Sequence, residues 1–193
     1  MDAEQTQVNL LIARAFDELH IPYFLGGSMA SSVHGIYRAT ADADFVAVIR
    51  PEHAESLERL FRPAFYAEIE TMRAAATTGR SFNIIHLETL LKVDVFVAHS
   101  PFHLVQMQRR ILQSLAADGK TSMYVASPED TILAKLEWYR QGGGVSDRQW
   151  NDVLGVLKVQ RERLDAHYLH QQAQELGLVE LLHRALSDAG LPV

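Results

Sequence analysis

Two stretches of this chain place carboxylates within apolar, strand-like sequence. Residues 42–49 read Asp-Ala-Asp-Phe-Val-Ala-Val-Ile, and residues 93–97 read Val-Asp-Val-Phe-Val. The first stretch is nearly apolar on both faces, which predicts a central strand of a sheet. Asp42 and Asp44 are separated by one residue, so their side chains point to the same face of that strand. Asp94 lies mid-strand, where a charge is costly to bury unless it is paired or binds a metal.

The rest of the pattern divides into a mixed N-terminal part and a helical C-terminal part. Strand-like and helical segments alternate up to residue 126, whereas the apolar spacing is helical from Ser127 onward. This order predicts an α/β or α+β core in residues 1–126, with a helical region in residues 127–193 packed on it. Within the core, the pattern predicts a helix over 1–20, an antiparallel hairpin over 81–97, a helix over 102–111 and a last edge strand over 121–125.

The composition excludes several classes of protein. The 193 residues include no cysteine, which rules out a disulfide scaffold, a thiolate metal site and a cysteine nucleophile. With 18 Lys and Arg against 24 Asp and Glu, the net charge is −6, which argues against a broad, non-specific nucleic-acid binder. No stretch approaches the ~18 consecutive apolar residues that span a bilayer, and the N-terminus is acidic, unlike that of a signal peptide. We therefore expect a cytoplasmic protein with no membrane association.

A glycine-rich turn precedes the first carboxylate pair. Leu25-Gly26-Gly27-Ser28 ends a short strand and enters a helix of small residues. Glycines let a phosphate approach the backbone closely, and a helix N-terminus supplies unpaired N–H donors and partial positive charge. Ser28 adds a hydroxyl donor. Taken alone, such a turn is commonly an ordinary turn, but its position before the acidic strand favours a phosphate-binding role.

The carboxylates themselves favour a divalent metal. If Asp42, Asp44 and Asp94 lie on adjacent strands, a cation would relieve their mutual repulsion. Oxygen ligands select Mg²⁺ or Mn²⁺ over zinc. Two such metals about 3.5–4 Å apart activate an attacking oxygen and neutralise a leaving pyrophosphate.

The order of these features resembles the nucleotidyltransferase superfamily, whose fold is shared with DNA polymerase beta. The family pattern is a hydrophobic residue with Gly and Gly/Ser, about a dozen residues, an Asp-hydrophobic-Asp/Glu pair and a third acid on a later strand. Here 13 residues separate Ser28 from Asp42, and Asp94 takes the place of the third acid. The helix that starts at Ser127-Pro128 is similar to that of bacterial abortive-infection toxin nucleotidyltransferases, in which a lysine follows, as Lys135 does here.

The resemblance implies an α+β fold with a mixed sheet flanked by helices, and an enzyme that transfers a nucleoside monophosphate from a nucleoside triphosphate to a hydroxyl, releasing pyrophosphate. It implies two Mg²⁺ or Mn²⁺ ions held by Asp42, Asp44 and Asp94, which are also the catalytic residues. It implies a nucleotide-binding set, namely Gly26, Gly27, Ser28, Arg38 and Lys135. The acceptor stays open among transfer RNA, a protein and a small molecule, and an antitoxin is an implied partner.

Other interpretations remain open. The same fold can bind nucleotide without transferring it, as a regulatory or toxin–antitoxin partner protein. The same carboxylates also suit a phosphohydrolase or nuclease, although the Gly-Gly-Ser turn favours transfer. Arg38 also suits a solvated position or a structural ion pair. Arg148 and Asp152 have the i,i+4 spacing of an exposed ion pair on a helix.

Overall fold

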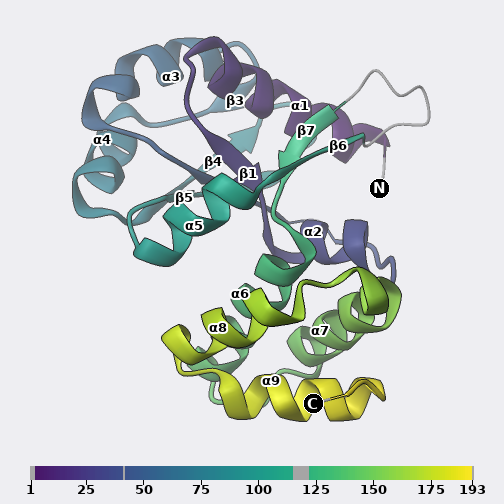
Figure 1. Cartoon of the computed structure of the whole chain (residues 1–193). Helices are drawn as coiled ribbons and strands as arrows, with labels where there is room; N and C mark the ends of the chain where they lie inside the picture. The colour runs from purple at the N-terminus through teal and green to yellow at the C-terminus, as the bar shows by residue number, and fades with distance from the viewer. Residues whose placement is uncertain (1–2, 41, 115–121, 193) are drawn as a thin grey trace. The chain divides into compact units, whose positions relative to one another are not determined.

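The computed structural model describes residues 3–40, 42–114 and 122–192. The chain divides into two compact units (Figure 1). The first comprises Met1–Gly26 and Ala39–Ala126, and the second comprises Gly27–Arg38 and Ser127–Val193. The short segment Gly27–Arg38 therefore belongs with the C-terminal helices, although it follows a strand of the first unit directly in sequence.

The described residues of the first unit form a seven-stranded mixed sheet in the order β3-β4-β5-β2-β1-β7-β6. The β2–β5 and β1–β7 pairs are parallel, and the other neighbours are antiparallel. With the helices this confirms the expected mixed α+β class. The strands are β1 (Tyr23–Leu25), β2 (Ala43–Ala47), β3 (Phe65–Tyr66), β4 (Ser81–His86), β5 (Lys92–Val97), β6 (Ile111–Ser114) and β7 (Ser122–Val125). The helices are α1 (Ala3–Glu18), the 3-10 turn η1 (Pro51–His53), α3 (Ala54–Phe61), α4 (Ile69–Thr78) and α5 (Pro101–Arg109).

The predicted hairpin is confirmed, whereas the predicted edge strand is wrong. β4 and β5 pair antiparallel over 81–96. Residue 121, the first of the predicted edge strand, lies outside the described residues. The remainder forms β7, which has β1 on one side and β6 on the other, so the edge is β6. The helix predicted over 102–111 is α5, but it ends at Arg109, and Ile111, which the prediction placed in the helix, begins β6 instead.

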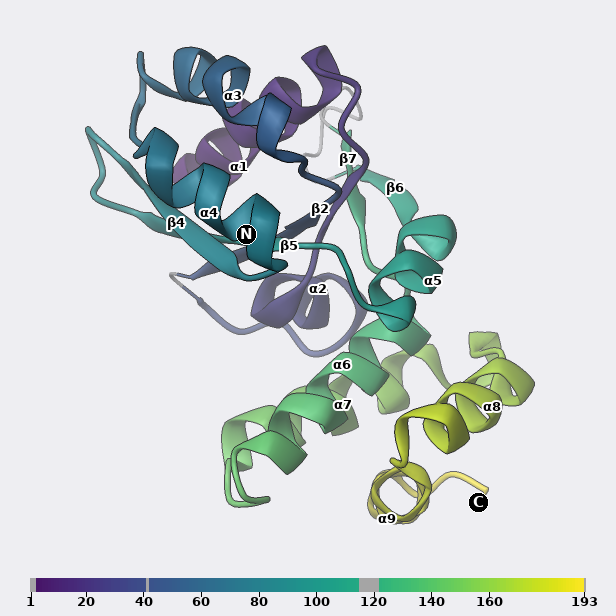
Figure 2. The same ribbon diagram turned by 90° about the vertical axis from the view of Figure 1, so that its left-hand side faces the viewer.

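One face of the sheet is covered by helices packed around aromatic side chains. Phe16 of α1 lies between Tyr23, Phe45 and Phe61, with ring centroids 5.4–6.2 Å from its own. α1 packs on α3, α3 packs on α4, and α4 packs on β4. Figure 2 shows these three helices gathered together over the strands. All four aromatic side chains are almost completely buried, which makes this face the core of the unit.

The second unit is helical. α2 (Gly27–His34) packs on α6 (Pro128–Gln141) and α7 (Asp147–Gln160), and these two helices pack on each other. The 3-10 turn η2 (Arg161–Arg163), α8 (Ala166–Leu176) and α9 (Val179–Ala189) complete it. Ser127 and Ser146 each cap the helix that follows them, accepting the N–H of the residue three positions on. No described helix is both long and apolar enough to cross a membrane.

Two glycines bring the end of α2 against α7. A Cβ at Gly35 would lie 2.7 Å from the backbone nitrogen of Val156 and 2.8 Å from the carbonyl carbon of Gly155. A Cβ at Gly155 would in turn lie 3.2 Å from the backbone nitrogen of Ile36. Only glycine permits two backbones to approach this closely. The contact fixes α2 within the helical unit.

Candidate active site

Asp44 and Asp94 lie opposite each other on neighbouring strands of the first unit. β2 and β5 are parallel, and Asp44 is in register with Asp94. Parallel neighbours are about 4.8 Å apart and paired residues point to the same side, so the two carboxylates project from one face. Asp42 is exposed and lies one residue before β2. It is two residues from Asp44, so in an extended chain the two side chains point to the same face of the strand. On the other side of β5, Asn83 pairs with Asp94, which extends the polar row to β4.

Lys92, which the sequence pattern did not single out, contacts this row. Its Nζ lies 2.8 Å from Asp94 Oδ1 and donates a hydrogen bond of 3.0 Å to Oδ2. The hydrogen bond to Asp94 raises the pKa of Lys92 above its ordinary value, and the charges of Asp94, Asp42 and Asp44 add to the effect. The Lys92 ammonium is therefore bound directly to the carboxylate of Asp94.

The donor chemistry of the aspartates fits a hard divalent cation, because the ligands they offer are carboxylate oxygens. Asp42, Asp44 and Asp94 are the residues that would hold it. Across the described part of the chain, no three or more His, Asp or Glu side chains are arranged as a complete metal-binding group. As positioned, the carboxylate of Asp94 binds Lys92 through both oxygens.

The Gly-Gly-Ser turn carries the chain from β1 into α2. The Gly26 N–H donates to the carbonyl oxygen of Asp44 at 2.8 Å, which ties the first glycine to the carboxylate-bearing strand. Gly27 begins α2 with φ +55°, a left-handed conformation that favours glycine. The helix N-terminus that follows offers backbone N–H groups and a partial positive charge at Ser28.

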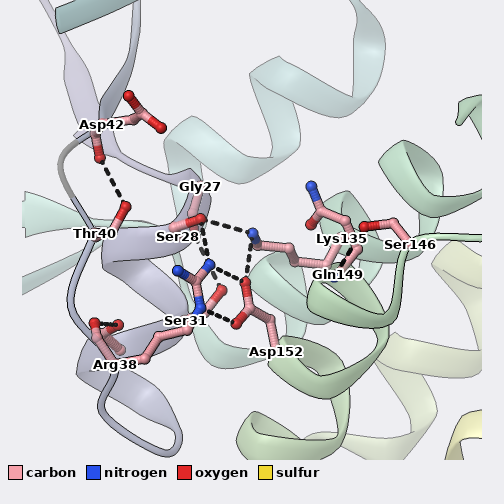
Figure 3. A network of polar contacts seen from close by, with 11 residues as sticks. Gly27, Ser28, Ser31, Arg38, Thr40, Asp42, Lys135, Ser146, Gln149 and Asp152 are labelled. Carbon is pink, nitrogen blue, oxygen red and sulfur yellow. Dashed lines mark hydrogen bonds and ion pairs between the residues drawn. The ribbon is translucent and has the colours of Figure 1, made fainter. Parts of the chain in front are cut away.

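Ser28 belongs to a closed ring of polar contacts within the second unit (Figure 3). Its Oγ accepts a hydrogen bond from Arg38 Nη2 at 2.8 Å and one from Lys135 Nζ at 3.2 Å. Asp152 joins the same two cations from α7: its Oδ1 accepts from Arg38 Nε at 2.7 Å, and its Oδ2 accepts from Arg38 Nη2 and Lys135 Nζ at 2.8 Å each. Residues from three segments of the chain thus meet at the start of α2.

Burial makes this ring electrostatically strong. Lys135 is 4% exposed and Asp152 is 8% exposed. Burial alone would raise the pKa of Asp152, but the hydrogen bonds from Arg38 and Lys135, together with their charges, hold it below its ordinary value. Asp152 is therefore ionised at neutral pH, and its charge compensates the buried Lys135 and the partly exposed Arg38.

The interpretation of Arg148 and Asp152 as an exposed helix pair is wrong. Asp152 is buried and forms ion pairs with Arg38 and Lys135, whereas Arg148 is exposed. A signal for this burial was present in the sequence. Asp152 lies three and four residues before Gly155 and Val156, which share its helix face and are also buried.

The structure distributes the expected site residues over both units. Each was expected from the resemblance, and their assigned roles stay predictions. Those in the first unit are Gly26, Asp42, Asp44 and Asp94, and those in the second are Gly27, Ser28, Arg38 and Lys135. Within the first unit the structure pairs Asp44 with Asp94, and within the second it brings Ser28, Arg38 and Lys135 together.

Comparison with known proteins identifies the fold. No protein-family model and no curated protein sequence matches the chain. An antigenic nucleotidyltransferase-like protein from Paracoccidioides brasiliensis is similar in structure, with a TM-score of 0.64 and 19% identity over 96% of this chain and 91% of that one. The chain has the nucleotidyltransferase fold. The antibiotic-resistance factor ANT(2'')-Ia, solved with adenylyl-2''-tobramycin, also shares this nucleotidyltransferase fold, with a TM-score of 0.59 and 14% identity over 90% of this chain and 97% of that one.

Proposed function

We propose that the protein is a metal-dependent nucleotidyltransferase, which transfers a nucleoside monophosphate from a nucleoside triphosphate to a hydroxyl group. The observation that carries the proposal is the in-register pairing of Asp44 with Asp94 on neighbouring strands of this fold. Two carboxylates held on one face by the sheet itself suit the binding of Mg²⁺ or Mn²⁺, with Asp42 as the third ligand. Phosphoryl transfer needs mainly positioning and neutralisation of charge, which these groups supply.

The triphosphate is assigned to the start of α2. Arg38 and Lys135 donate to the two lone pairs of the Ser28 oxygen, so the Ser28 hydroxyl hydrogen is the group that remains for a ligand. A phosphate oxygen would accept this hydrogen bond together with backbone N–H groups at Gly27 and Ser28. The same phosphate would be attracted by Arg38 and Lys135, both of which donate hydrogen bonds to the Ser28 side chain.

The bond changes balance without an added redox partner. The acceptor hydroxyl oxygen forms a bond to the α-phosphorus, and the bond from that phosphorus to its bridging oxygen breaks. Pyrophosphate leaves with the electron pair, and we assign the hydroxyl proton to Asp94. When bound, the divalent cation supplies charge neutralisation for the reacting phosphates. Within the second unit, Ser28, Arg38 and Lys135 are the groups that would bind phosphate oxygens.

The experiment is transfer of label from each α-labelled nucleoside triphosphate, with Mg²⁺ or Mn²⁺, to the hydroxyl compounds of a cell extract. Asp44→Asn and Asp94→Asn are expected to lower transfer by at least about a hundredfold, since each removes a charge that acts on the transition state. Glu88→Gln, an exposed change in the β4–β5 turn, is the matched control and should leave transfer unchanged.

The labelled product would identify the acceptor class among RNA, protein and small molecules. Transfer that persists in Asp44→Asn and Asp94→Asn would contradict the proposal. Metal-dependent nucleotide binding with no transfer to any acceptor would instead favour a catalytically silent nucleotide-binding protein, with a regulatory or toxin–antitoxin-type partner role. Release of inorganic phosphate or free nucleoside monophosphate with water alone would favour a hydrolase.

A further inference from the structure

Lys92 lies beside a carboxylate of the proposed metal site. It begins β5 two residues before Asp94, so the two side chains share one face of the strand. Its Nζ contacts both carboxylate oxygens of Asp94, at 2.8 and 3.0 Å. Asp42 and Asp44 attract the same ammonium electrostatically. A cation that belongs to the chain therefore already binds a carboxylate of this row, Asp94.

An ammonium and a divalent cation compete for the same oxygens. Each lone pair of Asp94 that accepts a hydrogen bond from Lys92 is unavailable to a metal, and a bound metal would repel the ammonium. The side chains of Lys92 and Asp94 are 51% and 27% exposed. An ion pair with this much contact with water is weak and exchanges readily, so a doubly charged ion can displace the lysine.

We propose that Lys92 is a built-in counter-ion of the carboxylate row, which neutralises Asp94 in the metal-free protein and is displaced when a divalent cation binds. The inference rests on the metal-binding part of the proposed function. In this inference Lys92 is the residue that sets how tightly the carboxylate row binds the metal. Lys92 relieves repulsion among the aspartates before the metal arrives, and it lowers the affinity of the site for free metal.

The experiment measures Mn²⁺ binding by electron paramagnetic resonance at fixed ionic strength, with no nucleotide present. Lys92→Gln should bind Mn²⁺ roughly threefold to tenfold more tightly than the parent protein, because a competing positive charge has been removed. Lys158→Gln is the matched control, since it changes the net charge equally at an exposed position on α7. Its Mn²⁺ affinity should equal that of the parent.

A double-mutant cycle tests whether the effect of Lys92 on Mn²⁺ affinity depends on Asp94. In an Asp94→Asn background, Lys92→Gln should change Mn²⁺ affinity much less, because the carboxylate for which lysine and metal compete is gone. Thermal unfolding supplies an independent readout and a check on folding. Without divalent ions Lys92→Gln should melt at a lower temperature than the parent, and its stabilisation by Mn²⁺ should be larger.

The outcomes separate this inference from the proposed function. If the parent binds Mn²⁺ and Asp94→Asn abolishes binding, but Lys92→Gln binds like Lys158→Gln, the counter-ion role is overturned and the metal site stands. If neither the parent nor Lys92→Gln binds Mn²⁺ at millimolar concentration, both the inference and the metal-dependent function are overturned.

Discussion

Asp152 of α7 binds the guanidinium of Arg38 through two hydrogen bonds, from Nε at 2.7 Å and from Nη2 at 2.8 Å. The two residues are 114 positions apart in sequence. This bidentate contact joins the loop after α2 to the C-terminal helices, and it directs Arg38 Nη2 onto Ser28 as well.

Replacing Asp152 should destabilise the protein strongly. Asp152→Ala removes the carboxylate that pairs with the buried Lys135 ammonium and with the guanidinium of Arg38. The loss of one member of a buried ion pair costs about 3–5 kcal/mol in the free energy of unfolding. Arg148→Ala, one turn earlier on the same helix and exposed, should change stability by less than about 0.5 kcal/mol. Urea unfolding of both variants checks the prediction, and equal midpoints for the two would contradict it.

The contribution of Asp152 should also depend on pH. Its pKa is lower in the folded protein than in the unfolded chain, where it is about 3.9. The stabilisation is therefore complete above the unfolded value and is lost as the pH falls through the folded value. The difference in unfolding free energy between the parent and Asp152→Asn should be constant from about pH 7 to 5 and shrink below about pH 4. A difference that stays constant down to pH 2.5 would show that Asp152 is not held ionised by its partners.

Nucleotide binding should depend on Lys135. Lys135→Met keeps most of the apolar stem of the side chain but removes the ammonium that donates to Ser28 and that we propose attracts phosphate. The affinity for a nucleoside triphosphate, measured by titration calorimetry, should fall about tenfold to a hundredfold, as expected for loss of a charged hydrogen-bond partner. Lys158→Met is the matched control, because Lys158 is exposed on α7. Unchanged affinity in Lys135→Met would remove this residue from the nucleotide site.

The approach of α2 to α7 should make Gly35 intolerant of substitution. In Gly35→Ala the new methyl group would meet backbone atoms of Gly155 and Val156 at 2.8 and 2.7 Å, so the helices must separate. We expect a loss of about 1–3 kcal/mol in the free energy of unfolding. Gly26→Ala is the control, since the nearest atoms to its Cβ would be at 3.7 Å, an ordinary contact. Equal unfolding midpoints for the two variants would show that the close approach does not constrain the fold.

Local sequence patterns were sufficient to predict the helices and strands whose hydrophobic periodicity is set by their own residues. The apolar strand at 42–49, the hairpin at 81–97 and the helical C-terminal region have periodicities set by their own residues. β6 was missed because Ile111 and Leu112, its two apolar residues, continue the helical spacing of α5 and are exposed at the sheet edge. An exposed edge strand has no buried face to give it an alternating pattern.

The sequence by itself determined which residue types carry the chemistry, in what order, and with what strand alternation: Gly-Gly-Ser before a helix, Asp42 and Asp44 on one face, and Asp94 on a later strand. The tertiary structure decided their partners. The sheet register places Asp44 opposite Asp94, and the close approach at Gly35 groups α2 with α6 and α7. Asp152 acquires its partners only there, because the strength of an electrostatic interaction depends on distance and burial, and neither follows from position along the chain when the partners are as far apart in sequence as Asp152 and Arg38.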